Sequence, residues 1–153
     1  MISLIIPCYN EEEVLHTCHN RVTDAINDLT GFEFEIIYID DGSTDSTYKL
    51  LKELQKKDKR LKTLKLSRNF GKEAAVTAGI DYAAGDAAII LDADLQDPPE
   101  LIPDIIRKWK EENVDVVYGQ RTSRLGDTWL KKTTGSAFYT IMTFISGRVH
   151  IPY

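Results

Sequence analysis

The sequence lacks the glycine-rich motifs that cradle phosphates in the common nucleotide-binding folds. No strand-like stretch is followed by G-x-G-x-x-G or by the P-loop pattern G-x-x-x-x-G-K-[ST], which argues against dinucleotide binding and against P-loop chemistry. The G-x-S-x-G elbow of serine hydrolases is also missing. Any nucleotide must therefore be bound by other groups.

Cysteine, excess basic charge and long apolar runs are scarce as well. Cys8 and Cys18 have no metal-ligand spacing, so we expect both to be reduced thiols. A net charge of −5 gives no reason to expect nucleic acid as a partner. The longest uncharged stretch, from Thr133 to Gly147, is shorter than the about 20 residues of a membrane-spanning helix, so none is predicted. The N-terminus enters a strand pattern at once, and no signal peptide is expected.

What the sequence contains is a regular alternation of strand and helix patterns. We expect strands at 2–6 (closed by Pro7), 35–39, 61–66 (at an edge or in a half-exposed position), 86–91 (covered on both faces) and 115–119. We expect helices at 11–29, 45–57, from 72 onward, and 99–111. This alternation predicts an α/β fold, a three-layer α/β/α sandwich with a mostly parallel central sheet, in one domain spanning residues 1–153.

The run Asp92-Ala93-Asp94-Leu95-Gln96 follows the expected strand 86–91. Loops at the carboxyl ends of parallel strands form the usual ligand edge of such folds. Two carboxylates and the Gln96 carboxamide are hard oxygen ligands, suited to Mg²⁺ or Mn²⁺. A calcium loop would need glycine and glutamate where Asp97 and Pro103 stand, and a phosphoaspartate loop fits poorly at Gln96. The alternative is that this run is a solvated turn with no ligand.

A second acidic turn, Asp40-Asp41-Gly42-Ser43, ends the strand 35–39. Aspartate and serine also cap helices, but two adjacent aspartates exceed what one cap needs. We therefore favour contact with ribose hydroxyls and a base N–H.

Three kinds of side chain elsewhere could bind ligands. Lys72, at a helix start, could meet a phosphate or be a plain surface lysine. Arg121, just past a strand end, could hold a phosphate bidentately. His16 and His19 are spaced to share a metal, but we expect them to be surface residues.

The segment 128–147, with its apolar part from Trp129 to Ile145, is predicted to be either a core helix or a helix lying in a membrane interface.

Four stretches together resemble the family 2 glycosyltransferases with the GT-A fold. They are Ile6 to Glu12 (I-P-C-Y-N-E-E), Asp40 to Ser43 (D-D-G-S), Leu91 to Glu100 (L-D-A-D-L-Q-D-P-P-E) and Gly119 to Arg121 (G-Q-R). Within that family the chain is most similar to the polyprenyl-phosphate sugar transferases, the group of dolichyl-phosphate mannose synthase and the bactoprenol glucosyltransferases.

The resemblance implies a role for each matching residue. The nucleotide sugar would be bound by Pro7, Tyr9, Glu11, Ile39, Asp41, Asp92, Ala93 and Asp94. The metal, Mg²⁺ or Mn²⁺, would be held by Asp92, Asp94 and Gln96. The acceptor phosphate would be held by Arg121 with Lys131 or Lys132. The chain resembles the N-terminal catalytic part of a longer enzyme on the cytoplasmic face of a membrane, with the candidate catalytic carboxylate beyond Tyr153; this stretch alone would be soluble.

The expected activity is metal-dependent, inverting transfer of a hexose from a nucleoside-diphosphate sugar to polyprenyl phosphate. Two alternatives stay open: the same donor site with a soluble sugar or polysaccharide acceptor, and a non-catalytic nucleotide-binding domain. The sequence does not choose between UDP and GDP, and it does not give the sugar or the oligomeric state.

Overall fold

The computed structural model describes residues 1–119. Its compact unit runs from Met1 to Val117, and a second unit begins at Tyr118. The predicted helix 128–147 and the predicted acceptor residues Arg121, Lys131 and Lys132 lie outside the described residues. None of the helices in the described part is long and apolar enough to cross a membrane.

Strands and helices alternate along the compact unit. The strands are β1 (Ile2–Cys8), β2 (Phe34–Asp40), β3 (Leu61–Lys65) and β4 (Ala87–Ile90). The helices are α1 (Leu15–Asn27), α2 (Thr47–Lys57), α3 (Lys72–Tyr82) and α4 (Ile102–Glu112), the last preceded by the short 3₁₀ turn η1 (Pro99–Leu101). The prolines at the start of η1 and α4 stand where a missing N–H costs no helical hydrogen bond.

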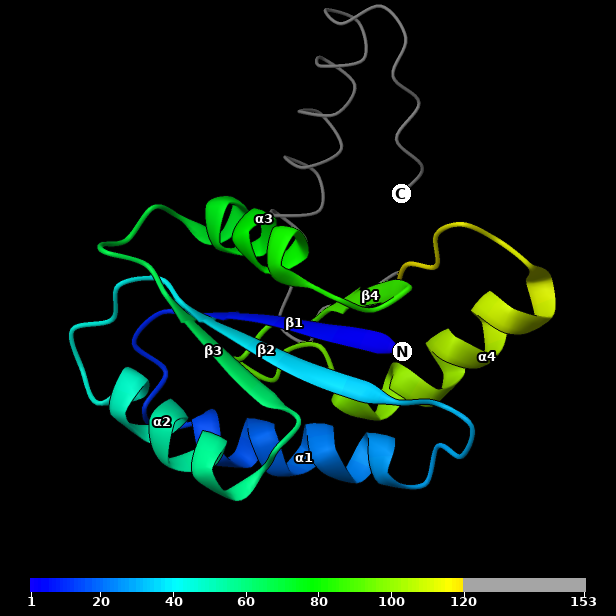
Figure 1. Cartoon of the computed structure of the whole chain (residues 1–153), viewed down its shortest axis with the longest axis horizontal. Coiled ribbons are helices and arrows are strands. Elements are labelled where there is room, and N and C mark those ends of the chain that lie inside the picture. The colour runs from blue at the N-terminus through cyan, green and yellow to red at the C-terminus, as the bar shows by residue number, and fades with distance from the viewer. Residues whose placement is uncertain (120–153) are drawn as a thin grey trace, which may run out of the picture. The chain divides into compact units, whose positions relative to one another are not determined.

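The four described strands form one parallel sheet in the order β3-β2-β1-β4. Figure 1 shows α3 on one face of the sheet and α1 and α2 on the other. Helix α4 contacts α1 and therefore lies on the α1 side. This is the predicted three-layer α/β/α arrangement with a parallel sheet, so the predicted fold class is confirmed. The edge position predicted for residues 61–66 also holds for β3 among the described strands.

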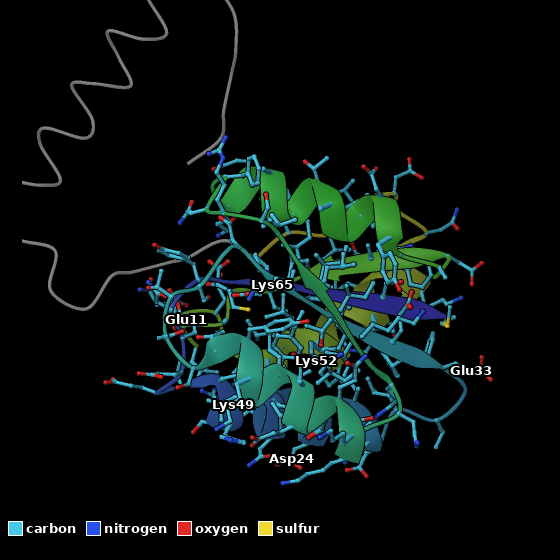
Figure 2. All side chains as sticks on the ribbon, turned by 60° about the vertical axis from the view of Figure 1, so that its left-hand side comes forward. Glu11, Asp24, Glu33, Lys49, Lys52 and Lys65 are labelled. Carbon is cyan, nitrogen blue, oxygen red and sulfur yellow. The ribbon has the colours of Figure 1, made fainter. Side chains whose placement is uncertain are left out.

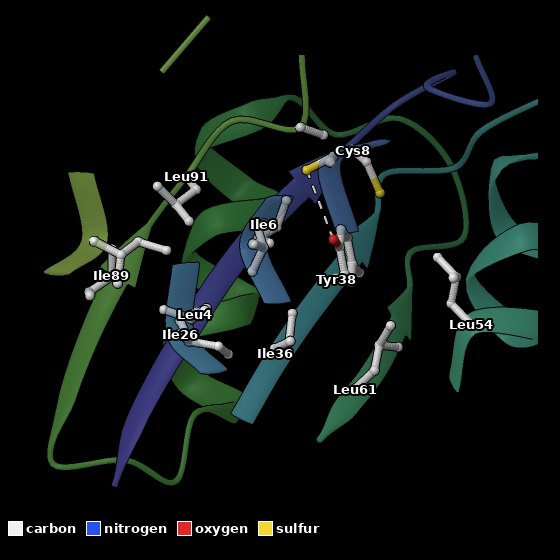
Figure 3. Packing of buried hydrophobic residues seen from close by; sticks show 14 of the residues in the cluster. Leu4, Ile6, Cys8, Ile26, Ile36, Tyr38, Leu54, Leu61, Ile89 and Leu91 are labelled. Atoms are coloured by element: carbon white, nitrogen blue, oxygen red, sulfur yellow. Dashed lines mark hydrogen bonds between the residues drawn. The ribbon is translucent and has the colours of Figure 1, made fainter. Parts of the chain in front are cut away.

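The core has two parts because successive strand residues point to opposite faces. Leu4 and Ile6 of β1 pack with Ile36 and Tyr38 of β2 against α1, whereas Ile5 and its neighbours pack against α3. Figure 3 shows the first cluster, in which the Tyr38 hydroxyl donates a hydrogen bond to the Cys18 sulfur. These side chains are fully buried, and burying each one contributes about 1.5–3 kcal/mol.

Helix α3 lies unusually close to the sheet. A Cβ added to Gly79 would lie 2.5 Å from Ile5 Cγ2 and 2.8 Å from Ile39 Cδ1. The small residues of this helix therefore serve packing, as their composition predicts, and they fix how α3 sits on β1 and β2.

The structure corrects the expectation that Pro7 ends the first strand, since β1 continues to Cys8. The backbone carbonyl of Ile5 accepts a hydrogen bond from Leu91 and that of Cys8 accepts one from Asp41. Alternate residues of a parallel strand bond to alternate neighbours, so Pro7 faces the β4 side, where β4 has already ended at Ile90. The missing N–H of proline therefore removes no ladder bond.

Two further expectations for the C-terminal half of the unit are wrong. Residues 115–119 form no strand in the described structure, and Val116 is 75% exposed. Strand β4 is not covered on both faces by the described residues, because Ile90 is 49% exposed while Ile89 is buried. An apolar run shows that a strand is possible, but the ladder forms only where a neighbour offers its backbone groups.

Candidate functional site at the carboxyl edge of the sheet

The loops that follow the strands meet at the carboxyl edge of the sheet. Figure 2 shows Glu11, after β1, at one end of the sheet and Glu33, before β2, at the opposite end. At the Glu11 end lies a cavity of about 380 Å³ lined by Pro7, Cys8, Tyr9, Glu11, Asp41, Asn69, Gly71, Lys72, Ala75, Asp92, Ala93 and Asp94. Residues far apart in the sequence are thus gathered where open α/β folds bind ligands.

The loops after β1 and β2 are held together by hydrogen bonds between them. The Asn10 N–H donates to Ser43 Oγ at 3.0 Å, and the Thr44 N–H donates back to Asn10 Oδ1 at 2.9 Å. The Glu11 N–H donates to Thr47 Oγ1 at 2.8 Å. The hydroxyl and acidic residues after β2 therefore hold the neighbouring loop, a role that neither sequence-based interpretation of this turn included.

Asp41 is buried and holds the turn between β3 and α3. Its two carboxylate oxygens accept hydrogen bonds from the N–H groups of Phe70, at 2.8 Å, and Gly71, at 2.9 Å. Gly42 has φ +70°, and a Cβ there would lie 2.3 Å from the backbone carbon of Arg68. The two turns thus pack backbone against backbone, and only glycine fits at this contact.

Asp92 forms an ion pair with Lys72 across the cavity. The Lys72 Nζ lies 2.6 Å from Oδ1 and 2.7 Å from Oδ2 of Asp92. Lys72 is the first residue of α3, and Asp92 follows β4. Lys72 was expected either to meet a phosphate or to be a plain surface lysine; it is exposed, and its ammonium contacts a predicted metal ligand.

The loop that carries the two aspartates has a constrained backbone. Asp94 is exposed, and its Oδ1 accepts a hydrogen bond from the Gln96 N–H at 2.9 Å. Leu95, between Asp94 and Gln96, has φ +62°, a left-handed conformation that costs a non-glycine residue roughly 1–2 kcal/mol. The loop then continues into η1, which Glu100 ties to α1 through two hydrogen bonds of 2.7 Å from Arg21.

Negative charge dominates the cavity. The pKa of Glu11 is raised, first by burial and then by the nearby carboxylates of Asp94, Asp45 and Asp92. Lys72 is the one basic side chain among the described residues that line the cavity. Such an excess of carboxylates attracts cations and repels anions.

The donor set at this edge fits a divalent cation. Asp92, Asp94 and the Gln96 side chain are hard oxygen ligands that follow one another along a single loop, and Asp92 already attracts a cation, the Lys72 ammonium. Within residues 1–119, no three His, Cys, Asp or Glu side chains converge as a complete cage.

The cavity brings together all but one of the residues predicted for the nucleotide sugar. Ile39 is the exception, because it is fully buried in the cluster beneath α3. Gln96, predicted for the metal, is exposed and does not line the cavity. The sequence-based prediction missed Asn69 and Gly71, which also line the cavity. A signal was available, because the turn 67–72 follows the end of a predicted strand, as the other predicted binding loops do.

The expectation that both histidines are surface residues is correct for His16 and wrong for His19. His19 is 6% exposed, with Nε2 3.7 Å from Asp58 Oδ2, and burial lowers its pKa. The i, i+3 spacing puts both histidines on the same side of α1, but only His19 is buried there.

A larger cavity, of about 560 Å³, lies beside β4. Its lining is mostly apolar, with Ile2, Ile89, Ile106 and Trp109, and the only ionisable side chains among the described residues there are Asp86 and Asp115. It lacks the converging polar groups that a specific site needs, and we place the site at the carboxyl edge.

Comparison with known proteins identifies the family of the chain. The model of the family described as "Glycosyl transferase family 2" matches residues 3–152. An uncharacterized glycosyltransferase, YkcC, of Bacillus subtilis (strain 168) is 45% identical over 141 residues, which are 92% of this chain and 43% of that protein. A bactoprenol glucosyl transferase of Shigella phage SfV is 42% identical over 145 residues, 95% of this chain and 47% of that protein. The chain therefore spans about half the length of these curated relatives.

Among solved structures, S. aureus TarS 1-349 matches with a TM-score of 0.65 and 25% identity, over 83% of this chain and 38% of that one. Its complex with UDP matches with a TM-score of 0.62. The family match covers nearly the whole sequence. The chain belongs to glycosyl transferase family 2 and has the GT-A fold of that family's transferases.

Proposed function

We propose that the protein transfers a hexose from a nucleoside-diphosphate sugar to polyprenyl phosphate. The observation that carries the proposal is the cavity at the carboxyl edge, where Pro7, Tyr9, Glu11, Asp41, Asp92, Ala93 and Asp94 come together. The family supports sugar transfer, and the similarity to a bactoprenol glucosyl transferase supports a polyprenyl acceptor over a soluble sugar.

In this proposal, different residues of the cavity bind different parts of the nucleotide sugar. Pro7 and the half-exposed Tyr9 offer apolar surface to the nucleoside. Asp41 holds the β3–α3 turn in place and keeps oxygen lone pairs for a ribose hydroxyl or a base N–H. Ile39 would not contact the donor with its side chain. It would support the turn from beneath.

Asp92, Asp94 and Gln96 would hold Mg²⁺ or Mn²⁺ beside the diphosphate. The cation's contribution is to neutralise the charge that develops on the departing diphosphate. In the transfer step an acceptor phosphate oxygen attacks the anomeric carbon as the bond from that carbon to the diphosphate oxygen breaks, which inverts the configuration. Arg121 with Lys131 or Lys132 would hold the acceptor phosphate; all three lie outside the described residues.

The first test is metal-dependent binding of the donor nucleotide, measured by calorimetry with UDP, GDP and CDP. Replacing Asp94 by alanine removes one anionic ligand, so nucleotide affinity in the presence of Mn²⁺ should fall by roughly 10–100-fold. Asp81→Ala is the matched control, because Asp81 is an exposed carboxylate near the far end of α3. Equal affinities for Asp94→Ala and the parent with Mn²⁺ would refute the metal role of this loop.

Transfer itself is measured as nucleotide-dependent appearance of labelled hexose on undecaprenyl phosphate, with a soluble oligosaccharide as the competing acceptor. Label on the oligosaccharide alone would favour the alternative acceptor class. Nucleotide binding without transfer of hexose to either acceptor would favour a non-catalytic nucleotide-binding role.

A further inference from the structure

The Lys72–Asp92 ion pair has a feature that the proposed donor site does not explain. The lysine ammonium contacts both oxygens of Asp92, at 2.6 and 2.7 Å. A divalent cation at Asp92 would bind one or both of these oxygens. A metal ion and an ammonium on the same carboxylate repel each other, so binding of the metal favours displacement of the ammonium.

Backbone contacts of the β3–α3 turn and of α3 hold Lys72 in this position. Asp41 fixes the N–H groups of Phe70 and Gly71, and Gly71, with φ +97°, turns the chain directly into α3. Close packing of Gly79 on the sheet fixes the same helix from its other end. The first side chain of α3 is thereby aimed at the cavity, opposite the end of β4.

The side chain itself is free to move. Lys72 is 56% exposed at its side chain, whereas Asp92 is 25% exposed. A lysine has a flexible four-carbon stem and a compact charge, so its ammonium can swing by several ångströms without any backbone change. The cavity into which it would swing is the one assigned to the donor.

We propose that Lys72 is a built-in counter-cation, which neutralises Asp92 when the donor is absent and moves to the donor's diphosphate when the metal takes Asp92. The inference rests on the proposed function and deepens it by adding a diphosphate-binding side chain outside the metal loop.

The test uses Lys72→Met, which keeps the length of the side chain and removes its charge. Without the competing ammonium, Mn²⁺ alone should bind about 3- to 10-fold more tightly, because a like charge a few ångströms away has been removed. The nucleoside diphosphate in saturating Mn²⁺ should bind about 3- to 10-fold more weakly, because one phosphate contact is lost. Opposite signs in the two titrations are the signature of the proposed exchange.

Mn²⁺ binding is read by electron paramagnetic resonance of the free ion, and nucleotide binding by calorimetry. Lys49→Met is the control for a lost positive charge, since Lys49 is exposed on α2, on the other side of the sheet from α3 (Figure 2). It should change neither affinity by more than about twofold, since a distant exposed charge is largely screened. Lys72→Gln, checked by circular dichroism, guards against an effect of the methionine on folding.

Unchanged or weaker Mn²⁺ binding in both Lys72 variants would overturn the inference and reduce the ion pair to a structural contact. Tighter Mn²⁺ binding together with unchanged nucleotide binding would overturn the transfer of the ammonium to the diphosphate. A parent protein that binds Mn²⁺ but no nucleotide would refute the proposed function, whereas the Mn²⁺ titrations would still report on the competition.

Discussion

Glu35 shows how much one buried carboxylate can depend on its partners. It lies near the start of β2, at the end of the sheet away from the cavity, and is 3% exposed. Burial by itself would raise its pKa, but hydrogen bonds from Lys62, Ser3 and the Ala84 N–H outweigh burial and lower the pKa to about 2. The Lys62 Nζ lies 2.7 Å from Oε2, and the Ala84 N–H donates to Oε1 at 2.7 Å. The charged form of Glu35 therefore joins β1, β2, β3 and the turn before β4.

This network predicts a loss of stability in acid. The folded-state pKa lies below the ordinary value of 4.5, so the stabilisation is fully present above that value and is lost as the pH falls toward 2. Urea unfolding of the parent should show a free energy of unfolding that declines across this range. Glu35→Gln should be less stable than the parent at neutral pH, by on the order of 1–3 kcal/mol, and the difference should shrink at pH 3. A constant difference between pH 7 and pH 3 would contradict the network.

The sequence predicted which residues form the site better than it predicted their contacts. Asp92 and Asp94 could be placed at the carboxyl edge because an apolar run of strand length precedes them and two prolines follow. The partner of Asp92 could not be predicted, because Lys72 is twenty positions earlier and the two meet only through the strand order. For the same reason the sequence suggested a ligand role for Asp41, which stays a prediction, and did not reveal that Asp41 accepts the hydrogen bonds that hold the β3–α3 turn.

At the level of elements, all four described strands were predictable, most directly the two with neighbours on both sides. In β1 and β2 almost every residue is buried, and their continuous apolar runs indicate this directly. Residues 115–119 have a similar pattern but form no ladder in the described structure. The extension of β1 through Pro7 depends on where β4 ends. Both outcomes are set by a neighbouring strand, which local sequence does not contain.

Helix α3 gives a prediction about how packing supports the site. Gly79→Ala would place a methyl group within 2.5 Å of Ile5 Cγ2, so α3 must shift or the isoleucines must repack. We expect a loss of about 1–3 kcal/mol in the free energy of unfolding, the usual cost of overpacking. Ala74→Leu, which adds more volume at an exposed position of the same helix, should change stability by less than about 0.5 kcal/mol. The measurement is urea unfolding of both variants; a neutral Gly79→Ala would show that α3 is not seated as described.

At the scale of the whole molecule, the charge opposes the proposed ligand. The protein carries a net charge of −5, and the cavity gathers Glu11, Asp41, Asp92 and Asp94 against the single ammonium of Lys72 among its described residues. A nucleoside diphosphate is itself an anion. Its approach without a metal is therefore unfavourable over distances of the order of the Debye length, about 8 Å at physiological salt.

This charge balance predicts that salt has opposite effects on the two binding modes. Without divalent cations, raising KCl from about 20 to about 200 mM should tighten the weak binding of UDP or GDP, by about two- to fivefold, because the ions screen a repulsion. With saturating Mn²⁺ the local charge at Asp92 and Asp94 is offset, so the nucleotide meets an attractive site and the same change in salt should weaken binding. Calorimetric titrations of the parent at both salt concentrations, with Mn²⁺ and with a chelator, measure the two slopes. If added salt weakened binding in the chelator as it does with Mn²⁺, basic side chains would dominate the encounter, and the acidic edge of the sheet would not be where the diphosphate enters.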